Sequence, residues 1–229
     1  MLEIKNIYKT FNPGTINEKV ALNGLSLKLN EGDFVTVIGG NGAGKSTMLN
    51  AVAGVWPVDE GQIIIDGTDV TKLSEYKRAA YLGRVFQDPM TGTAATMGIE
   101  ENLALAKRRG KTRFLRSGIT KAEREEYKEL LKILNLGLED RLTSKVGLLS
   151  GGQRQALTLL MATLQKPKLL LLDEHTAALD PKTAAKVLDI TDRIVNRDHL
   201  TTLMITHNMK DAIAHGNRLI MMMNGKIIL

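Results

Sequence analysis

One stretch of nine residues, Gly39 to Thr47, constrains this chain more than any other. It matches the pattern G-x-x-x-x-G-K-[ST] and lies between a short apolar run, Phe34 to Ile38, and a helix-like run, Met48 to Val55. A glycine-rich turn in that setting directs backbone N–H groups and the positive end of a helix at phosphate oxygens. The stretch therefore predicts a nucleoside triphosphate site. Its expected members are Gly39, Asn41, Gly42, Ala43, Gly44, Lys45, Ser46 and Thr47.

The last side chains of this stretch have the chemistry that a triphosphate and its metal ion require. We expect Lys45 to reach the β and γ phosphates, the Ser46 hydroxyl to bind Mg²⁺, and Thr47 to lie near the α phosphate. The alternative is a glycine-rich turn without a ligand. A pattern of this length between a strand and a helix seldom arises by chance.

Hydrophobic periodicity predicts an α/β fold with a mainly parallel sheet. Residues 2–11, 20–29 and 61–66 read as strands, and their simplest assembly is an antiparallel β layer at the N-terminal end of the chain. After residue 149, strands and helices alternate at a size that implies right-handed crossovers between parallel strands. Together with the phosphate loop, this pattern predicts a P-loop NTPase core of the RecA-like kind.

A helical insert interrupts the strands. Residues 100–107 and 120–136 are helix-like, and the second run opens with Thr120 and Glu123 at capping-box spacing. We therefore expect one domain over residues 1–229, in which a helical subdomain interrupts the nucleotide-binding core. The predicted boundaries are 1–87 and 150–229 for the core and 88–149 for the helical subdomain.

Two carboxylates follow the most apolar strand of the sequence. The leucines from Leu169 to Leu172 read as a strand buried on both faces, and Asp173 and Glu174 end it. Because ligand sites of open parallel sheets collect at the carboxyl ends of strands, both acids are expected beside the phosphate loop. We expect Asp173 to hold Mg²⁺ through its water shell and Glu174 to act as general base toward the attacking water. An acidic helix cap is the alternative, but it explains only one of them.

A second anion-binding helix terminus is predicted at Ser150, Gly151, Gly152 and Gln153. Its serine hydroxyl and free N–H groups can donate to phosphate oxygens, and its glycines allow a close approach. A chain that binds one triphosphate does not need two such termini for it. The run from Leu149 to Gln153 resembles the signature motif of the ATP-binding cassette (ABC) ATPases, and the other motifs of that family follow in its order over essentially the whole chain.

The resemblance implies further site residues. Phe11 would stack on adenine, with Tyr8 as the less favoured candidate. Gln87 would contact Mg²⁺ and the attacking water, and His207 would contact the γ phosphate. Asp180 would lie in the loop that crosses the interface of a cassette dimer.

The sequence departs from the family pattern at three side-chain positions. His175 follows Glu174 where proline is commoner, and we expect a structural or tuning effect rather than loss of activity. Ala156 and Met161 occupy helix positions where the family often carries arginine.

The resemblance also implies ATP and Mg²⁺ as cofactors and a second ABC ATPase chain, expected to be identical, as dimer partner. Transmembrane permease subunits would use the ATP-driven closing and reopening of that dimer. A solute-binding protein would be a further partner if the system imports. No secretory signal or apolar run of membrane-spanning length is present. The resemblance then implies a peripheral protein at the cytoplasmic face of the membrane. The motifs around Gln87 and Glu174 look like those of bacterial importers of amino acids or similar small solutes.

Two other functions remain as alternatives, an exporter subunit and a soluble ABC ATPase that acts on nucleic acid or ribosomes. Members of the second class usually carry a long coiled coil, paired cassettes or cysteine metal clusters. This sequence has none of these and contains no cysteine. We therefore expect no nucleic-acid partner.

The positive charge of the chain is local. The formal net charge is +6, and residues 102–122 contain no acid. This basic run predicts a solvated loop between two helices, or else a contact with anionic lipid headgroups. Its basic residues are Lys107, Arg108, Arg109, Lys111, Arg113, Arg116 and Lys121.

Overall fold

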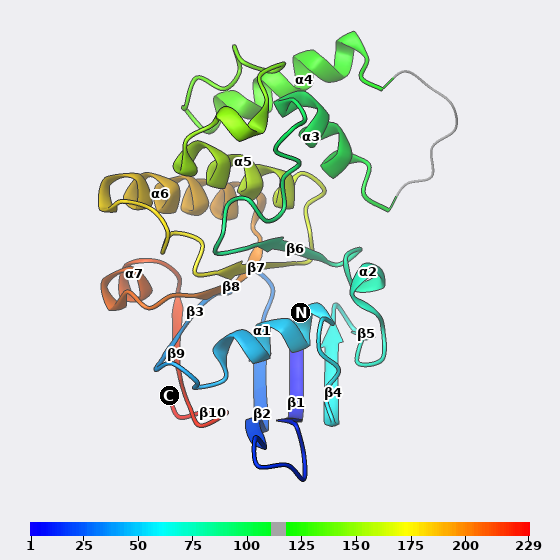
Figure 1. The fold of residues 1–229 in the computed structure, drawn as a ribbon, viewed down its shortest axis with the longest axis vertical. Coiled ribbons are helices and arrows are strands. Elements are labelled where there is room, and N and C mark those ends of the chain that lie inside the picture. Colours follow the sequence, from blue (N-terminus) through cyan, green and yellow to red (C-terminus); the bar gives the residue numbers. More distant parts are fainter. Residues whose placement is uncertain (111–117) are drawn as a thin grey trace. The chain divides into compact units, whose positions relative to one another are not determined.

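A computed structural model describes residues 1–110 and 118–229 of the chain (Figure 1). The described residues form two compact units. Unit 1 consists of Met1–Gly83, Pro167–Glu174 and His199–Leu229. Unit 2 consists of Arg84–Lys166 and His175–Asp198, so it contains more of the chain than the predicted helical subdomain 88–149.

The antiparallel layer of unit 1 confirms the prediction from strand periodicity. Its strand order is β2-β1-β4-β5, and β5 is a short strand that the sequence did not predict. Alternation places Leu2, Ile4 and Ile63 on one face, and all three are buried. Leu2 pairs with Leu29 on one side and Ile65 on the other, which keeps the apolar faces in register. The strands are β1 (Leu2–Phe11), β2 (Lys19–Leu29), β4 (Glu60–Ile65) and β5 (Thr68–Asp69).

The second sheet has the order β10-β9-β3-β8-β7-β6 and includes the strand before the phosphate loop. Strands β9, β3, β8 and β7 run parallel, and β10 is antiparallel to β9. All four leucines of β7 are fully buried, as expected for a strand covered on both faces. The strands are β3 (Phe34–Gly39), β6 (Leu82–Val85), β7 (Leu169–Asp173), β8 (Thr201–Ile205), β9 (Arg218–Met223) and β10 (Lys226–Ile227).

Helices α1 (Lys45–Ala53), α2 (Glu75–Arg78) and α7 (Met209–Ala214) belong to unit 1. The apolar side of α1 joins the core, with Met48, Leu49 and Val52 fully buried. The mainly parallel sheet and the antiparallel layer thus confirm the expected α/β P-loop architecture.

Unit 2 is largely helical. Its elements are α3 (Ile99–Lys107), α4 (Lys121–Lys132), the 3-10 turn Val146–Leu148, α5 (Gly151–Thr163) and α6 (Pro181–Asp198). The predicted capping box at α4 is formed, because Thr120 Oγ1 accepts from Glu123 N and the Glu123 carboxylate accepts from Thr120 N. Helix α4 ends at Lys132 rather than 136, since Asn135 adopts a left-handed φ of 51° that a helix cannot contain.

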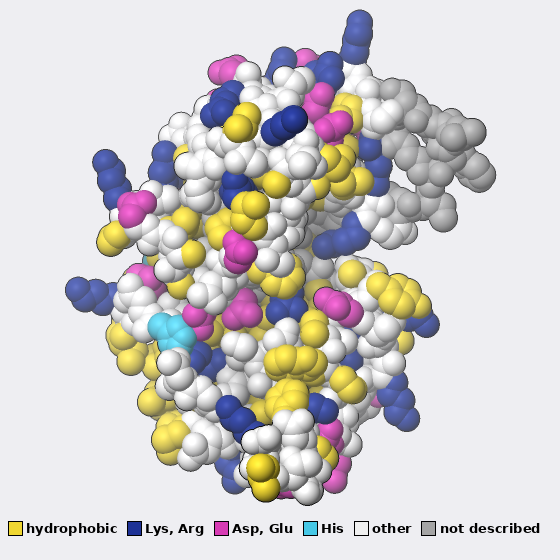
Figure 2. Space-filling view, viewed as in Figure 1, with side chains coloured by type: hydrophobic (Ala, Val, Ile, Leu, Met, Phe, Trp, Pro, Cys, Tyr) yellow, Lys and Arg dark blue, Asp and Glu magenta, His cyan; other side chains and the backbone are white. Residues whose placement is uncertain are grey.

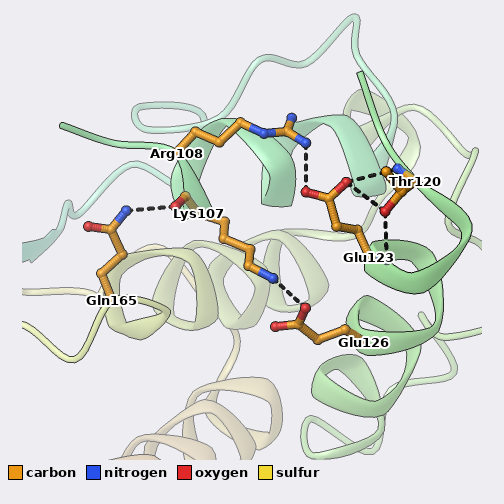
Figure 3. A network of polar contacts seen from close by, with 6 residues as sticks. All are labelled: Lys107, Arg108, Thr120, Glu123, Glu126 and Gln165. Atoms are coloured by element: carbon orange, nitrogen blue, oxygen red, sulfur yellow. Dashed lines mark hydrogen bonds and ion pairs between the residues drawn. The ribbon is translucent and has the colours of Figure 1, made fainter. Parts of the chain in front are cut away.

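The ends of the basic run are tied into unit 2 (Figure 3). Lys107 forms an ion pair with Glu126, and Arg108 Nη2 lies 2.8 Å from Glu123 Oε1. Gln165 Nε2 donates to the carbonyl of Lys107 at 2.8 Å. Two charges of the run are therefore paired with acids of α4, whereas Lys111, Arg113 and Arg116 lie outside the described residues.

The visible face of the molecule carries mixed charge. Lysine and arginine side chains are scattered among acidic and apolar ones in Figure 2 and do not form one continuous basic surface on that face. Within residues 1–110 and 118–229, no helix has the length and apolar character needed to span a bilayer.

Candidate functional site

The phosphate loop needs glycine at two positions for steric reasons. Gly39 has a φ of 151°, and a Cβ there would lie 2.3 Å from the carbonyl oxygen of Met222. Gly44 has a φ of 101°, and its Cβ would lie 2.5 Å from the Ala21 carbonyl oxygen. Both distances are far below van der Waals contact, so only glycine allows the neighbouring strands to approach the loop.

The loop ends in an open helix terminus. Gly44 is the N-cap of α1 and offers no side-chain cap to the N–H groups of the first turn. Those groups and the helix dipole favour an anion. Asn41, Gly42 and Ser46 are exposed, Thr47 is half-buried and Ala43 is buried beneath them. The exposed part of the loop thus includes the Ser46 hydroxyl and the backbone of Asn41 and Gly42.

Lys45 lies folded back over this loop. Its Nζ donates to the carbonyls of Gly39 at 2.7 Å and Gly40 at 3.1 Å, and the residue is 5% exposed. Burial lowers the pKa of Lys45, and the nearby carboxylates of Glu174 and Asp173 oppose that effect. The ammonium is therefore held by two backbone carbonyls of the loop itself.

Asp173, Glu174 and His207 lie at or just after the carboxyl ends of the neighbouring strands β7 and β8. Asp173 ends β7, Glu174 follows it, and His207 follows β8 by two residues; β7 and β8 pair in parallel. Glu174 has a left-handed φ of 48° and donates its N–H to the Ile205 carbonyl. Its Oε1 lies 2.6 Å from Nε2 of His207. Glu174 and His207, which the sequence analysis singled out separately, are thus in direct contact.

Phe11 lies at the end of β1 and is half-buried. The ring of Trp56 meets it edge-on, with centroids 5.0 Å apart and planes at 81°. Tyr8 instead covers Gly24, since a Cβ there would lie 2.9 Å from the Tyr8 hydroxyl. The sequence reasoning missed Trp56, although it is the only tryptophan of the chain.

Gln87 is exposed and follows β6 in unit 2. The residue before it is anchored, because Gln155 Nε2 donates to the carbonyl of Phe86 at 3.1 Å. Gln155 is fully buried, and its Oε1 has no hydrogen-bond partner among the described residues. The backbone leading to Gln87 is therefore fixed to helix α5.

The signature run begins helix α5 with a capping box. Ser150 Oγ accepts from the N–H of Gln153 at 3.3 Å, and Gln153 Oε1 accepts from the N–H of Ser150 at 3.2 Å. The Ser150 hydroxyl retains its proton as a donor for a ligand. Packing explains the glycine at position 152, because a Cβ added to Gly152 would lie 2.1 Å from Thr183 Cγ2. Gly151 is exposed beside Leu179.

A cavity of about 370 Å³ lies beside this helix start within unit 2. Ser150, Gly152 and Gln153 line it together with Thr183 and Lys186 of α6. Asp180 precedes α6 and caps it, with Oδ1 accepting from the N–H of Thr183 at 3.1 Å. Hydrogen bonds from the Thr183 side chain and backbone hold the pKa of Asp180 below its usual value. The packing of α5 on α6 thus shapes the signature region.

His175 is buried and takes part in a hydrogen bond within unit 2. Its Nε2 lies 3.1 Å from Thr191 Oγ1, and that hydroxyl donates to the Val187 carbonyl at 2.9 Å. Because the hydroxyl has one proton, Nε2 of His175 must be the donor. This interaction places the histidine after Glu174 in the buried packing of unit 2.

Arg78 is a second residue that the sequence reasoning missed. Its guanidinium donates to the carbonyls of Ala51 and Val52 at the end of α1, at 2.6 and 2.9 Å, and to those of Thr71 and Leu73. The residue is 2% exposed, and burial lowers its pKa. No motif marks it, since a lone arginine in a polar stretch normally reads as a surface residue.

Comparison with known proteins gives consistent results. Residues 22–177 match the sequence model of a family described as ABC transporter. A tyrosine transport ATP-binding protein of Clostridioides difficile is 47% identical over 234 residues, which cover 100% of this chain and 91% of that protein. A spermidine/putrescine import ATP-binding protein of Haemophilus influenzae is 33% identical, over 99% of this chain and 56% of its own length.

A methionine import ATP-binding protein of Bartonella henselae is 33% identical, over 100% of this chain and 64% of its own length. The chain thus spans only about half to two thirds of the polyamine and methionine relatives. Among solved structures, a dimeric post-hydrolysis ATP-binding cassette bound to ADP and Pi superposes with a TM-score of 0.83 at 31% identity, covering 100% of this chain and 97% of the other. A nucleotide-free cassette from an ABC transporter gives 0.81 at 27% identity, covering 100% and 90%.

Proposed function

Because this chain belongs to the ABC transporter family, as an ATPase that converts ATP and water to ADP and phosphate, we propose that it powers the import of an amino acid. The single observation that carries the solute class is the 47% identity, over nearly the full length of both chains, to a tyrosine transport ATP-binding protein. A methionine import protein is among the more distant relatives. Tyrosine or a related amino acid is therefore the solute to test first.

We assign hydrolysis to the contact at the carboxyl ends of β7 and β8. Glu174, with its carboxylate 2.6 Å from His207 Nε2, is positioned as general base toward the attacking water. His207 orients that carboxylate and reaches the γ phosphate. Lys45 exchanges its two carbonyl partners for β and γ phosphate oxygens, and Thr47 lies near the α phosphate. Gln87 orients the water and the metal ion as the cassette closes.

Mg²⁺ has suitable donors in unit 1. The Ser46 hydroxyl is exposed at the loop and the Asp173 carboxylate is half-buried at the end of β7, and hard oxygen ligands of this kind suit magnesium. Magnesium usually takes only one or two protein ligands, with phosphate oxygens and water completing its shell. When bound, Mg²⁺ supplies neutralisation of the charge that develops on the transferred phosphate.

The nucleotide site is composite in this proposal. The phosphate loop of one chain faces Ser150, Gly151, Gly152 and Gln153 of a second, identical chain, and Asp180 crosses the interface. The dimeric arrangement of structurally similar cassettes supports it. ATP binding closes the dimer and hydrolysis reopens it.

The partners follow from the importer assignment. Permease subunits dock on residues 87–102 and on the helical subdomain 88–149, and a solute-binding protein delivers the amino acid. The chain then acts as a peripheral subunit at the cytoplasmic face of the membrane. Export and action on nucleic acid are less favoured, because the relatives described above are import or transport proteins.

Uptake of labelled solute tests this function. Cells with the chromosomal copy removed are complemented with the wild-type chain or with Glu174→Gln, and labelled tyrosine uptake is measured. We expect the wild-type chain to restore uptake and Glu174→Gln not to restore it. Unlabelled tyrosine should compete with the labelled solute, and spermidine should not. Equal uptake in both strains, with loss of efflux in the variant, would instead assign the chain to an exporter.

A further inference from the structure

The loop from Gly54 to Asp59 is fastened at both ends within unit 1. At its start, the N–H groups of Gly54 and Val55 donate to the Asn50 carbonyl and close the end of α1. At its end, Asp59 N donates to the Tyr8 carbonyl at 2.9 Å, and Asp59 Oδ2 accepts from Thr10 N at 2.6 Å. The loop therefore connects the helix of the phosphate loop to the last residues of β1.

Trp56 lies in the middle of this fastened loop and meets Phe11 edge-on at 5.0 Å. An edge-to-face arrangement at this separation is favourable for aromatic rings. A second restraint comes from Lys9, whose Nζ lies 5.7 Å from the Phe11 centroid and 2.8 Å from Asp59 Oδ1. Phe11 is only half-buried, so part of its ring stays accessible.

We propose that Trp56 is a positioning residue for adenine recognition, which holds the Phe11 ring in the orientation in which the base stacks on it. This inference rests on the proposed role of Phe11. The residue after Phe11, Asn12, already has a left-handed φ of 51° and starts an exposed turn, so β1 alone fixes the ring poorly. The fixed loop and the Trp56 edge supply the missing restraint.

The same loop joins the base platform to the helix that carries the phosphate donors. Helix α1 carries Lys45 at its first position and ends at Ala53, about 12 Å away along the helix axis. Trp56 follows three residues after the end of the helix, so the Phe11 platform and the phosphate donors are both anchored to α1. Removing the Trp56 ring should weaken base binding and leave phosphate binding unchanged.

Two probes separate these effects, namely ATP, which has a base, and inorganic tripolyphosphate, which has none. Their affinities are measured by titration calorimetry on the full chain with Glu174→Gln present to prevent turnover. Trp56→Ala should weaken ATP binding about threefold to tenfold, the range expected for loss of an aromatic pair. Tripolyphosphate binding should not change. Trp56→Phe, which keeps an aromatic edge, should recover most of the ATP affinity.

Tyr76→Ala is the matched control, because it removes a 75% exposed aromatic side chain of the same unit that lies on α2. It should bind both probes like the parent. Wild-type Trp56 supplies an independent signal as the only tryptophan: ATP should shift its fluorescence, and tripolyphosphate should not.

The outcomes distinguish this inference from the proposed site. If Phe11→Ala binds ATP normally, the assignment of Phe11 to adenine is wrong and this inference falls with it. If Phe11→Ala weakens ATP binding but Trp56→Ala and Trp56→Phe do not, only the role of Trp56 is overturned. Equal loss of both probes in Trp56→Ala, without recovery in Trp56→Phe, would show that the loop supports α1 rather than the base platform.

Discussion

His207 Nε2 and Glu174 Oε1 are 2.6 Å apart, although 33 positions separate the two residues in the sequence. The contact arises because β7 and β8 are paired in parallel, with Asp173 opposite Ile205. A carboxylate and an imidazole at one sheet edge can orient a water beside a phosphate. The first predictions concern this pair.

Glu174→Gln should retain ATP binding and collect as a closed dimer, while ATP turnover falls by about 10²- to 10⁴-fold, the usual contribution of general base catalysis. Phosphate release and size-exclusion chromatography with ATP measure the two effects. His207→Ala should also lower turnover, whereas His199→Asn should not, because His199 is exposed and asparagine tolerates its left-handed φ of 50°. Undiminished hydrolysis in Glu174→Gln would remove it as the base.

A composite site predicts complementation between inactive variants. Ser150→Arg blocks the signature side, and Lys45→Ala removes the ammonium that lies over the phosphate loop. Each homodimer should be inactive, whereas mixing the two variants should restore one functional site per heterodimer and at most half of the wild-type turnover per dimer. Phosphate release is followed at increasing mixing ratios. No recovery at any ratio would argue for sites contained in single chains.

The hydrogen bond between His175 and Thr191 predicts that replacing Thr191 costs more stability than replacing Thr163, another buried threonine. Thr191→Val removes the hydroxyl that the buried Nε2–H of His175 bonds, and should lower the free energy of unfolding in urea by about 1–3 kcal/mol. Thr191→Ser should restore most of that stability. Thr163→Val is the control, because Thr163 is also buried and bonded to a carbonyl of its own helix, without a histidine partner in the bonds that involve its hydroxyl. Equal losses of unfolding free energy in both valine variants would show that the contact with His175 adds no stability.

Arg78→Met should destabilise unit 1 by about 3 kcal/mol, because the buried carbonyls at the end of α1 lose a charged donor. Thermal unfolding with and without ATP measures the loss. Lys77→Met, on the exposed neighbouring position, should unfold like the wild type. A variant as stable as the wild type would mean that the carbonyls find other donors.

Asp69 predicts a pH-dependent contribution to stability. Donation from the Gln62 amide, followed by the Thr71 hydroxyl and N–H, lowers its pKa from 3.8 to about 2. A depressed folded-state pKa means that the contribution is complete above pH 3.8 and is lost as the pH falls from there toward 2. The difference in melting temperature between wild type and Asp69→Asn should therefore be constant at neutral pH and shrink below pH 3.8. A melting-temperature difference that does not change with pH would contradict this role of Asp69.

Local sequence patterns predicted the elements with small errors. The spacing of Thr120 and Glu123 located a capping box, and the leucines of β7 located a strand buried on both faces. The predicted end of α4 was wrong by four residues, because apolar periodicity continues through Leu134 while the backbone already turns at Asn135. Periodicity reports which side chains are buried, and it does not report where the backbone leaves the helix.

The sequence by itself determined the phosphate loop, the two carboxylates after β7 and the signature run, because each is a contiguous pattern whose chemistry depends on neighbouring residues. Only the tertiary structure decided that Glu174 touches His207 and that Trp56 meets Phe11. The same holds for the hydrogen bond from Arg78 to a carbonyl at the end of α1. These contacts join residues far apart in the chain, and strand pairing and burial create them. Local pattern carries no information about which distant side chain will fill a given space.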